Sequence, residues 1–123
     1  MKVSRSQFEE IVGEALDGVP EEFSEVLENV NLSVEEEPSE EDLRALGLDP
    51  DRDTLFGLYQ GVALPDRGLD YQSLPDRIII YRRPILDACR SREEVVEEVR
   101  QTVLHELGHY FGISEEEMPE EVV

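Results

Sequence analysis

The chain has 123 residues, 31 of them acidic and 11 basic, with a formal net charge of -20, and we expect one hydrophobic core in a single domain over residues 1–123. Nucleic acids and anionic membranes carry the same sign of charge, so we expect neither as a partner, whereas cations are favoured.

Other features of the sequence point to a soluble, cytoplasmic protein. The longest aliphatic run, residues 78–81, is far shorter than the roughly 20 residues of a membrane span. The first residues do not form a signal-peptide pattern. The single Cys89 cannot form an internal disulfide, which agrees with a reducing compartment.

The first third of the chain predicts helices and a strand. Ser6 and Glu9 form a capping-box pattern at the start of an amphipathic helix, which ends at Gly18. A short helical turn follows at Pro20. Residues 30–34 then alternate between apolar and polar side chains, which is typical of a half-buried strand.

The rest of the chain alternates short elements with turns and ends in one long helix. Residues 39–47 predict a capped short helix, and residues 54–64 a strand or a hairpin. Residues 78–81 are apolar on both faces, which predicts a central strand. A helical turn is expected over residues 84–89, and a capping box opens the longest helix, over residues 91–112.

The long helix carries the two histidines of the chain. His105 and His109 are one turn apart, so at about 100° per residue they face the same way. They share that face with Glu98 and Thr102. The apolar stripe of the helix lies on nearly the opposite side and comprises Val96, Val99, Val103, Leu107 and Tyr110.

The two histidines and Glu106 form the H-E-x-x-H pattern. Imidazoles at positions i and i+4 can reach one Zn²⁺ at about 2.0 to 2.1 Å. Glu106 projects beside such an ion, where its carboxylate can take a proton from zinc-bound water, whose pKa falls toward about 7. The pattern therefore predicts a zinc-dependent hydrolase, with two solvated histidines on a polar face as the alternative.

The residues after His109 extend the pattern. Gly112 follows three residues later and can adopt the left-handed conformation that ends a helix, and Glu115 follows three residues after that. Residues 105–115 thus read H-E-x-x-H-x-x-G-x-x-E. This string resembles the metzincin signature, with Glu115 in the place of the third histidine ligand.

The resemblance implies a site and its chemistry. His105, His109 and Glu115 would be the zinc ligands and Glu106 the general base, a set that leaves a fourth position open as in catalytic zinc sites. The next two residues, Glu116 and Glu117, remain alternatives to Glu115.

The chain as a whole resembles the small bacterial zincin-like metallopeptidases, through residues 105–115 and through residues 55–61, 75–78 and 81–85. The resemblance implies an α+β, minimal zincin-like domain. We expect a small mixed sheet of about three to four strands, packed with an N-terminal helix and a long C-terminal active-site helix. The implied activity is hydrolysis of peptide or protein substrates.

Several roles stay open at this stage. Zincins hold extended peptides against an edge strand, and residues 57–64 are the candidate edge. Arg82 and Arg83 either grip a substrate carboxylate or pair with nearby glutamates. Cys89 is expected to be buried and structural. The candidates for an oxyanion donor, by residue type only, are Tyr59, Tyr71, Tyr81 and Tyr110.

Two other functions remain possible from the sequence. The first is a non-catalytic, zinc-stabilised acidic protein that binds a basic partner. The second is a small zinc-dependent ribonuclease, which the net charge and the glutamate after the first histidine both disfavour.

Overall fold

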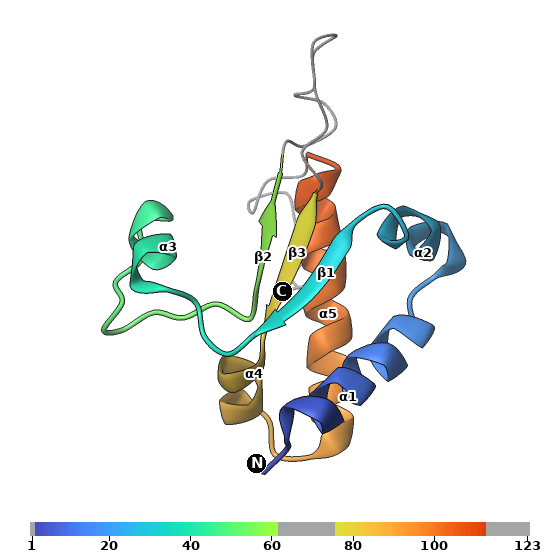
Figure 1. Ribbon diagram of the computed structural model, residues 1–123, viewed down its shortest axis with the longest axis horizontal. Helices are drawn as coiled ribbons and strands as arrows, with labels where there is room; N and C mark the ends of the chain where they lie inside the picture. Colours follow the sequence, from blue (N-terminus) through green and yellow to red (C-terminus); the bar gives the residue numbers. More distant parts are fainter. Residues whose placement is uncertain (1, 62–75, 113–123) are drawn as a thin grey trace, which may run out of the picture.

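The computed structural model describes residues 2–61 and 76–112, which form a three-stranded sheet and five helices (Figure 1). In chain order the elements are α1 (Arg5–Asp17), α2 (Glu21–Leu27), β1 (Asn31–Glu35), α3 (Glu40–Ala45), β2 (Gly57–Gln60), β3 (Arg77–Tyr81), α4 (Arg82–Ala88) and α5 (Arg92–Tyr110). This mixed architecture, with an N-terminal helix and a long helix near the C-terminus, confirms the expected fold class. None of the helices in these two ranges is long and apolar enough to cross a membrane.

The sheet has the strand order β1-β3-β2, with β1 parallel and β2 antiparallel to β3. The prediction of a central strand at residues 78–81 is confirmed. Residues 54–64 were expected to form a strand or a hairpin, and the described part of this segment contains only the short strand β2, at the edge of the sheet. Residues 62–64 lie outside the described residues.

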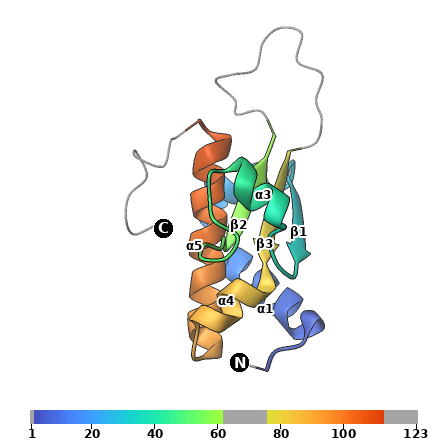
Figure 2. The ribbon, with the colours of Figure 1, turned by 90° about the vertical axis from the view of Figure 1, so that its left-hand side faces the viewer.

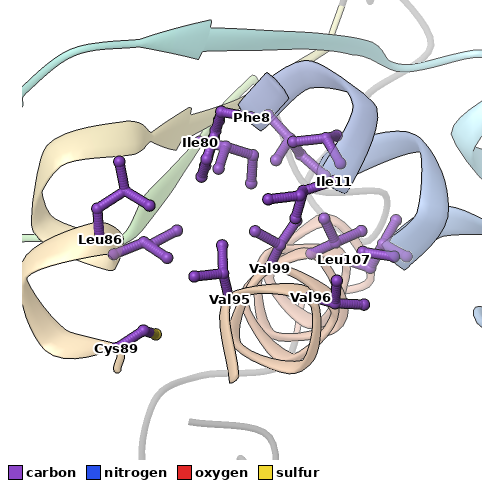
Figure 3. Close-up of a cluster of buried hydrophobic side chains, with 14 of the residues drawn as sticks. Phe8, Ile11, Ile80, Leu86, Cys89, Val95, Val96, Val99 and Leu107 are labelled. Atoms are coloured by element: carbon purple, nitrogen blue, oxygen red, sulfur yellow. The ribbon is translucent and has the colours of Figure 1, made fainter. Parts of the chain in front are cut away.

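The core lies between the sheet, α1 and α5 (Figure 3). Because side chains alternate along a strand, Ile78 and Ile80 point from β3 toward these helices. Phe8 of α1 and Val99 of α5 meet them there, and all four side chains are fully buried. Burial of each such side chain contributes about 1.5 to 3 kcal/mol. This packing holds α5 along one face of the sheet (Figure 2).

The start of α1 differs from the prediction. The capping box is formed by Ser4 and Gln7, not by Ser6 and Glu9: the Ser4 hydroxyl accepts from the Gln7 N–H at 3.1 Å, and the Gln7 side chain accepts from the Ser4 N–H at 2.9 Å. Both pairs fit the motif. The earlier start gives the backbone N–H of buried Phe8 a partner, the Ser4 carbonyl at 2.9 Å.

Helix α5 begins at the predicted N-cap and ends at the predicted glycine, but the predicted capping box is only half formed, because the Glu94 carboxylate accepts from the Arg90 N–H at 2.7 Å instead of from the Ser91 N–H. The hydroxyl of Ser91, the N-cap, accepts from the Glu94 N–H at 3.2 Å. At the other end, Gly112 has a φ of 84°, a conformation that favours glycine. Residues 105 to 109 therefore lie near the C-terminal end of this helix, beside β2.

Candidate metal centre and its cleft

The structure brings His105, Glu106 and His109 into one cluster. Each side chain offers a ligand atom, and these atoms all lie within 4.8 Å of one another. The two imidazole rings are nearly perpendicular, with centroids 4.9 Å apart. A tetrahedral zinc ion with bonds of about 2.0 to 2.1 Å holds two ligand atoms about 3.3 Å apart, and the His105 and His109 nitrogens lie within 4.8 Å of each other, with the Glu106 carboxylate beside them. The nitrogen and oxygen donors present here fit zinc.

The Glu106 carboxylate is buried and is held in place at one oxygen. Its side chain is 8% exposed. Oε1 accepts a hydrogen bond from the backbone N–H of Tyr59 in β2 at 2.9 Å, whereas Oε2 lies 3.9 Å from Nε2 of His105. One oxygen is therefore bound to the sheet, and the other is turned toward the candidate zinc ligands.

Gly57 makes this contact between strand and helix possible. A Cβ at this position would lie 2.5 Å from Cγ2 of Thr102 and 3.0 Å from the backbone oxygen of Ile79. Glycine thus lets β2 lie directly against α5, one helical turn before the histidines. The edge strand is thereby brought within hydrogen-bonding distance of Glu106.

The register of β2 leaves part of its backbone facing outward. The N–H of Tyr81 donates to the carbonyl of Phe56 at 2.9 Å, so Phe56, Leu58 and Gln60 form the pairs that exchange hydrogen bonds with β3. The backbone groups of Gly57 and Tyr59 between them point away from β3, to the outer edge of the sheet that the described residues form. The Tyr59 N–H that binds Glu106 is one of these outward groups.

A cleft of about 590 Å³ runs along this edge. Its walls come from the end of α3, from the chain that leads into β2, and from one face of α5. The lining residues are Leu46, Thr54, Leu55, Phe56, Gly57, Leu58, Tyr59, Glu98, Thr102, His105, Glu106 and His109. The prediction that Glu98 and Thr102 share a face with both histidines is confirmed.

The sequence did not indicate the aliphatic wall of this cleft or the Tyr59 backbone donor. Leu46 and Leu58 look like ordinary apolar residues in the sequence, and a backbone amide has no side-chain pattern at all. The clue that was available is Gly57, because glycine in a strand often marks a close backbone approach.

The candidate tyrosines have different surroundings. The Tyr59 hydroxyl donates to Oδ1 of buried Asp76 at 3.0 Å, and its ring meets that of Tyr110 edge to face at 6.0 Å. Tyr81 is 1% exposed, and burial raises its pKa to about 12, with the Asp42 carboxylate as a second cause. Of the described tyrosines, Tyr59 alone lines the cleft.

Contacts in the structure decide the roles of Arg82 and Cys89. The Arg82 guanidinium pairs with Glu36 at 2.8 Å and donates to the Val3 carbonyl at 2.6 Å, so the salt-bridge interpretation holds for this residue. Cys89 is 9% exposed and packs in the core, and burial raises the pKa of its thiol. The structural role expected for Cys89 is confirmed.

Part of the predicted site lies outside residues 2–61 and 76–112, which the structure describes. Glu115, the expected third ligand, and its competitors Glu116 and Glu117 lie outside the described residues, as does Tyr71.

The comparison with known families agrees with this geometry. A family model described as zincin-like metallopeptidase matches residues 27–122. The chain belongs to the zincin-like metallopeptidase family. Membership in this family implies zinc-dependent peptidase activity, a metal ion that is typically zinc, and peptide substrates. A search of curated proteins found no match to the chain.

Proposed function

We propose that the chain hydrolyses peptide bonds at a zinc site, with His105, His109 and Glu115 as ligands and Glu106 as general base. The observation that carries this proposal is the buried Glu106 carboxylate, clustered with both histidines at the wall of a cleft. A zinc ion bound by two imidazoles and a carboxylate would polarise a carbonyl and lower the pKa of water toward about 7.

The protein's own contribution is to position the proton carrier. With Oε1 bound to the Tyr59 N–H, the Glu106 carboxylate has one orientation, and Oε2 faces the ligand cluster. There it takes a proton from the attacking water and later delivers it to the leaving amine. The burial of Glu106 keeps bulk water from competing for that proton.

The open edge of β2 supports binding of an extended peptide. A substrate strand would pair with the outward backbone groups of Gly57 and with the outward carbonyl of Tyr59, beside the cleft. Because Glu106 already accepts from the Tyr59 N–H, the general base lies where the substrate backbone would pass. The proposed substrate is therefore an unfolded or flexible segment of polypeptide.

The third ligand is proposed on the sequence pattern and on the conformation of Gly112. Its φ of 84° is the left-handed conformation that commonly ends a helix, three residues before Glu115 in the sequence. Replacing Glu115, Glu116 or Glu117 singly with alanine tests the assignment. We expect only Glu115→Ala to lower the zinc content. An equal loss of zinc in Glu116→Ala or Glu117→Ala would assign the third ligand to that residue instead.

The proposal is tested by metal analysis combined with cleavage. Freshly purified protein should hold about one zinc per chain, His109→Ala should lose it, and Glu106→Gln should keep it. Unfolded proteins and a peptide library should be cleaved by the wild type and not by Glu106→Gln. Substoichiometric zinc, or equal cleavage by both proteins, refutes the proposal. If zinc binds without cleavage, the non-catalytic binding protein is the better interpretation.

Two broader expectations are also proposed. Residues 1–123 form a single domain, which is supported by Phe8 and Ile11 of α1 packing in the same core as α5. A cytoplasmic location is supported by the lone, buried Cys89 thiol.

A further inference from the structure

The cleft contains a carboxylate that the peptidase chemistry does not use. Glu98 lies on α5, on the same face as His105, and lines the cleft while half buried. Within the described residues it forms neither an ion pair nor a hydrogen bond. Burial raises its pKa, and the neighbouring Glu97 carboxylate adds to the shift. The surroundings of Glu98 therefore disfavour its negative charge, and a cation bound beside it would stabilise that charge.

The surroundings of Glu98 suit a side chain that is aliphatic along its length and charged at its end. Leu46, Leu55 and Leu58 contribute apolar walls to the same cleft, and Leu46 is 51% exposed, unusual for a large apolar residue in this structure. Lysine and arginine bury their methylene stems against apolar surface while their charged ends seek a polar partner. The stem of such a side chain would cover the leucines, and its charged end would neutralise the Glu98 carboxylate.

The distance along the helix matches the length of such a side chain. Glu98 precedes His105 by seven residues, which is about 10 Å along the helix axis at a rise of about 1.5 Å per residue. A lysine side chain extends about 6 Å from Cα to Nζ, with bonds of about 1.5 Å. One residue of an extended peptide adds about 3.3 Å. A residue next to the scissile bond at the histidines can therefore reach Glu98.

We propose that this cleft is a specificity pocket for a lysine or arginine side chain beside the scissile bond, in which Glu98 binds the cationic end. The inference rests on the peptidase function proposed above. The net charge of -20 acts in the same direction, because it attracts basic segments of polypeptide.

Binding to an inactive form measures the pocket without turnover. The zinc-loaded Glu106→Gln variant is titrated with two fluorescent peptides that differ only in lysine or norleucine, which has the same stem without the amine. We expect the lysine peptide to bind about 10-fold more tightly, the value for one charge-assisted hydrogen bond. Adding Glu98→Gln should abolish the difference, and adding Glu98→Arg should reverse it.

Two further variants separate charge from packing. Glu93→Gln removes one charge from the exposed first turn of the same helix and should preserve the lysine preference. Leu46→Ser should weaken the binding of both peptides about equally, because it removes a contact with the aliphatic stem that lysine and norleucine share. Circular dichroism and zinc content establish that each variant is folded and loaded.

The outcomes distinguish this inference from the peptidase proposal. If the wild type cleaves a peptide library in a zinc-dependent way without a lysine or arginine preference, or if Glu98→Gln keeps that preference, the pocket assignment is wrong while the peptidase stands. If no peptide is cleaved, the peptidase fails. Independently of cleavage, the pocket assignment is wrong if the lysine and norleucine peptides bind with equal affinity.

Discussion

Replacing Gly57 with alanine should disrupt the contact that joins the edge strand to the active-site helix. The new Cβ would lie 2.5 Å from Cγ2 of Thr102 and 3.0 Å from the Ile79 carbonyl oxygen. Carbon atoms in contact prefer about 3.5 to 4.0 Å, so β2 and α5 must separate by about 1 Å. Overpacking of this kind costs about 1 to 3 kcal/mol, and we expect the upper end because backbone is involved.

A double-mutant cycle isolates the cause. Thr102→Ser removes the methyl group that the added Cβ would strike, and by itself costs about 1 kcal/mol for one buried carbon. In the Gly57→Ala/Thr102→Ser protein the two losses should not add. We expect the double variant to be about 1 to 2 kcal/mol more stable than additivity predicts, and the remaining contact with Ile79 keeps the rescue partial.

The assay is urea unfolding of the zinc-loaded proteins, followed by circular dichroism. Gly13→Ala is the matched control, because nothing lies within 4 Å of a Cβ at this exposed helical position. It should stabilise the protein by about 0.5 to 1 kcal/mol. If Gly57→Ala is neutral, or if the cycle is additive within about 0.5 kcal/mol, the close approach of β2 to α5 is wrong.

Three other predictions test the scaffold. Ser91→Ala removes the N-cap of α5 and should cost about 1 kcal/mol in urea unfolding; no loss would mean that the cap is dispensable. Arg82→Ala should lower the free energy of unfolding by about 1 to 2 kcal/mol, because this 15% exposed side chain bonds both Glu36 and a backbone carbonyl. Arg44→Ala removes one partner of an exposed ion pair and should lower it by less than about 0.5 kcal/mol. Equal losses would contradict the burial argument. The raised pKa of Tyr81 means that the folded state keeps its phenol proton longer than the unfolded chain does. The contribution of Tyr81 to stability is therefore complete below pH 10 and is lost as the pH rises to about 12. Tyr81→Phe should make this loss of stability smaller when denaturation is measured across that pH range. An unchanged pH profile would contradict the raised pKa.

The features that the sequence predicted well are local ones. The spacing of His105 and His109 places them on one face of a helix, because helical geometry depends only on separation along the chain. The start of α5 at Ser91 and the turn at Gly112 follow from backbone groups within a few residues. The central position of β3 followed from its four consecutive apolar residues, which require burial on both faces.

The choice of cap for α1 shows where local patterns become ambiguous. Ser4 with Gln7 and Ser6 with Glu9 both fit the capping box, and the structure forms the first pair, whose start gives the N–H of buried Phe8 a backbone partner. That burial is a property of the packed core, so sequence spacing could not decide between the two starts.

The working surface of the site depends on residues that are far apart in the chain. The spacing of residues in the sequence was enough to place two imidazoles and the Glu106 carboxylate within one turn and a half of helix, where they form a candidate metal centre. Only the packed structure brings the Tyr59 N–H to the Glu106 carboxylate, across 47 residues, and places Leu46 and Glu98 in the lining of one cleft. Such contacts arise from the packing of a sheet edge against a helix, and that packing is settled by the whole core.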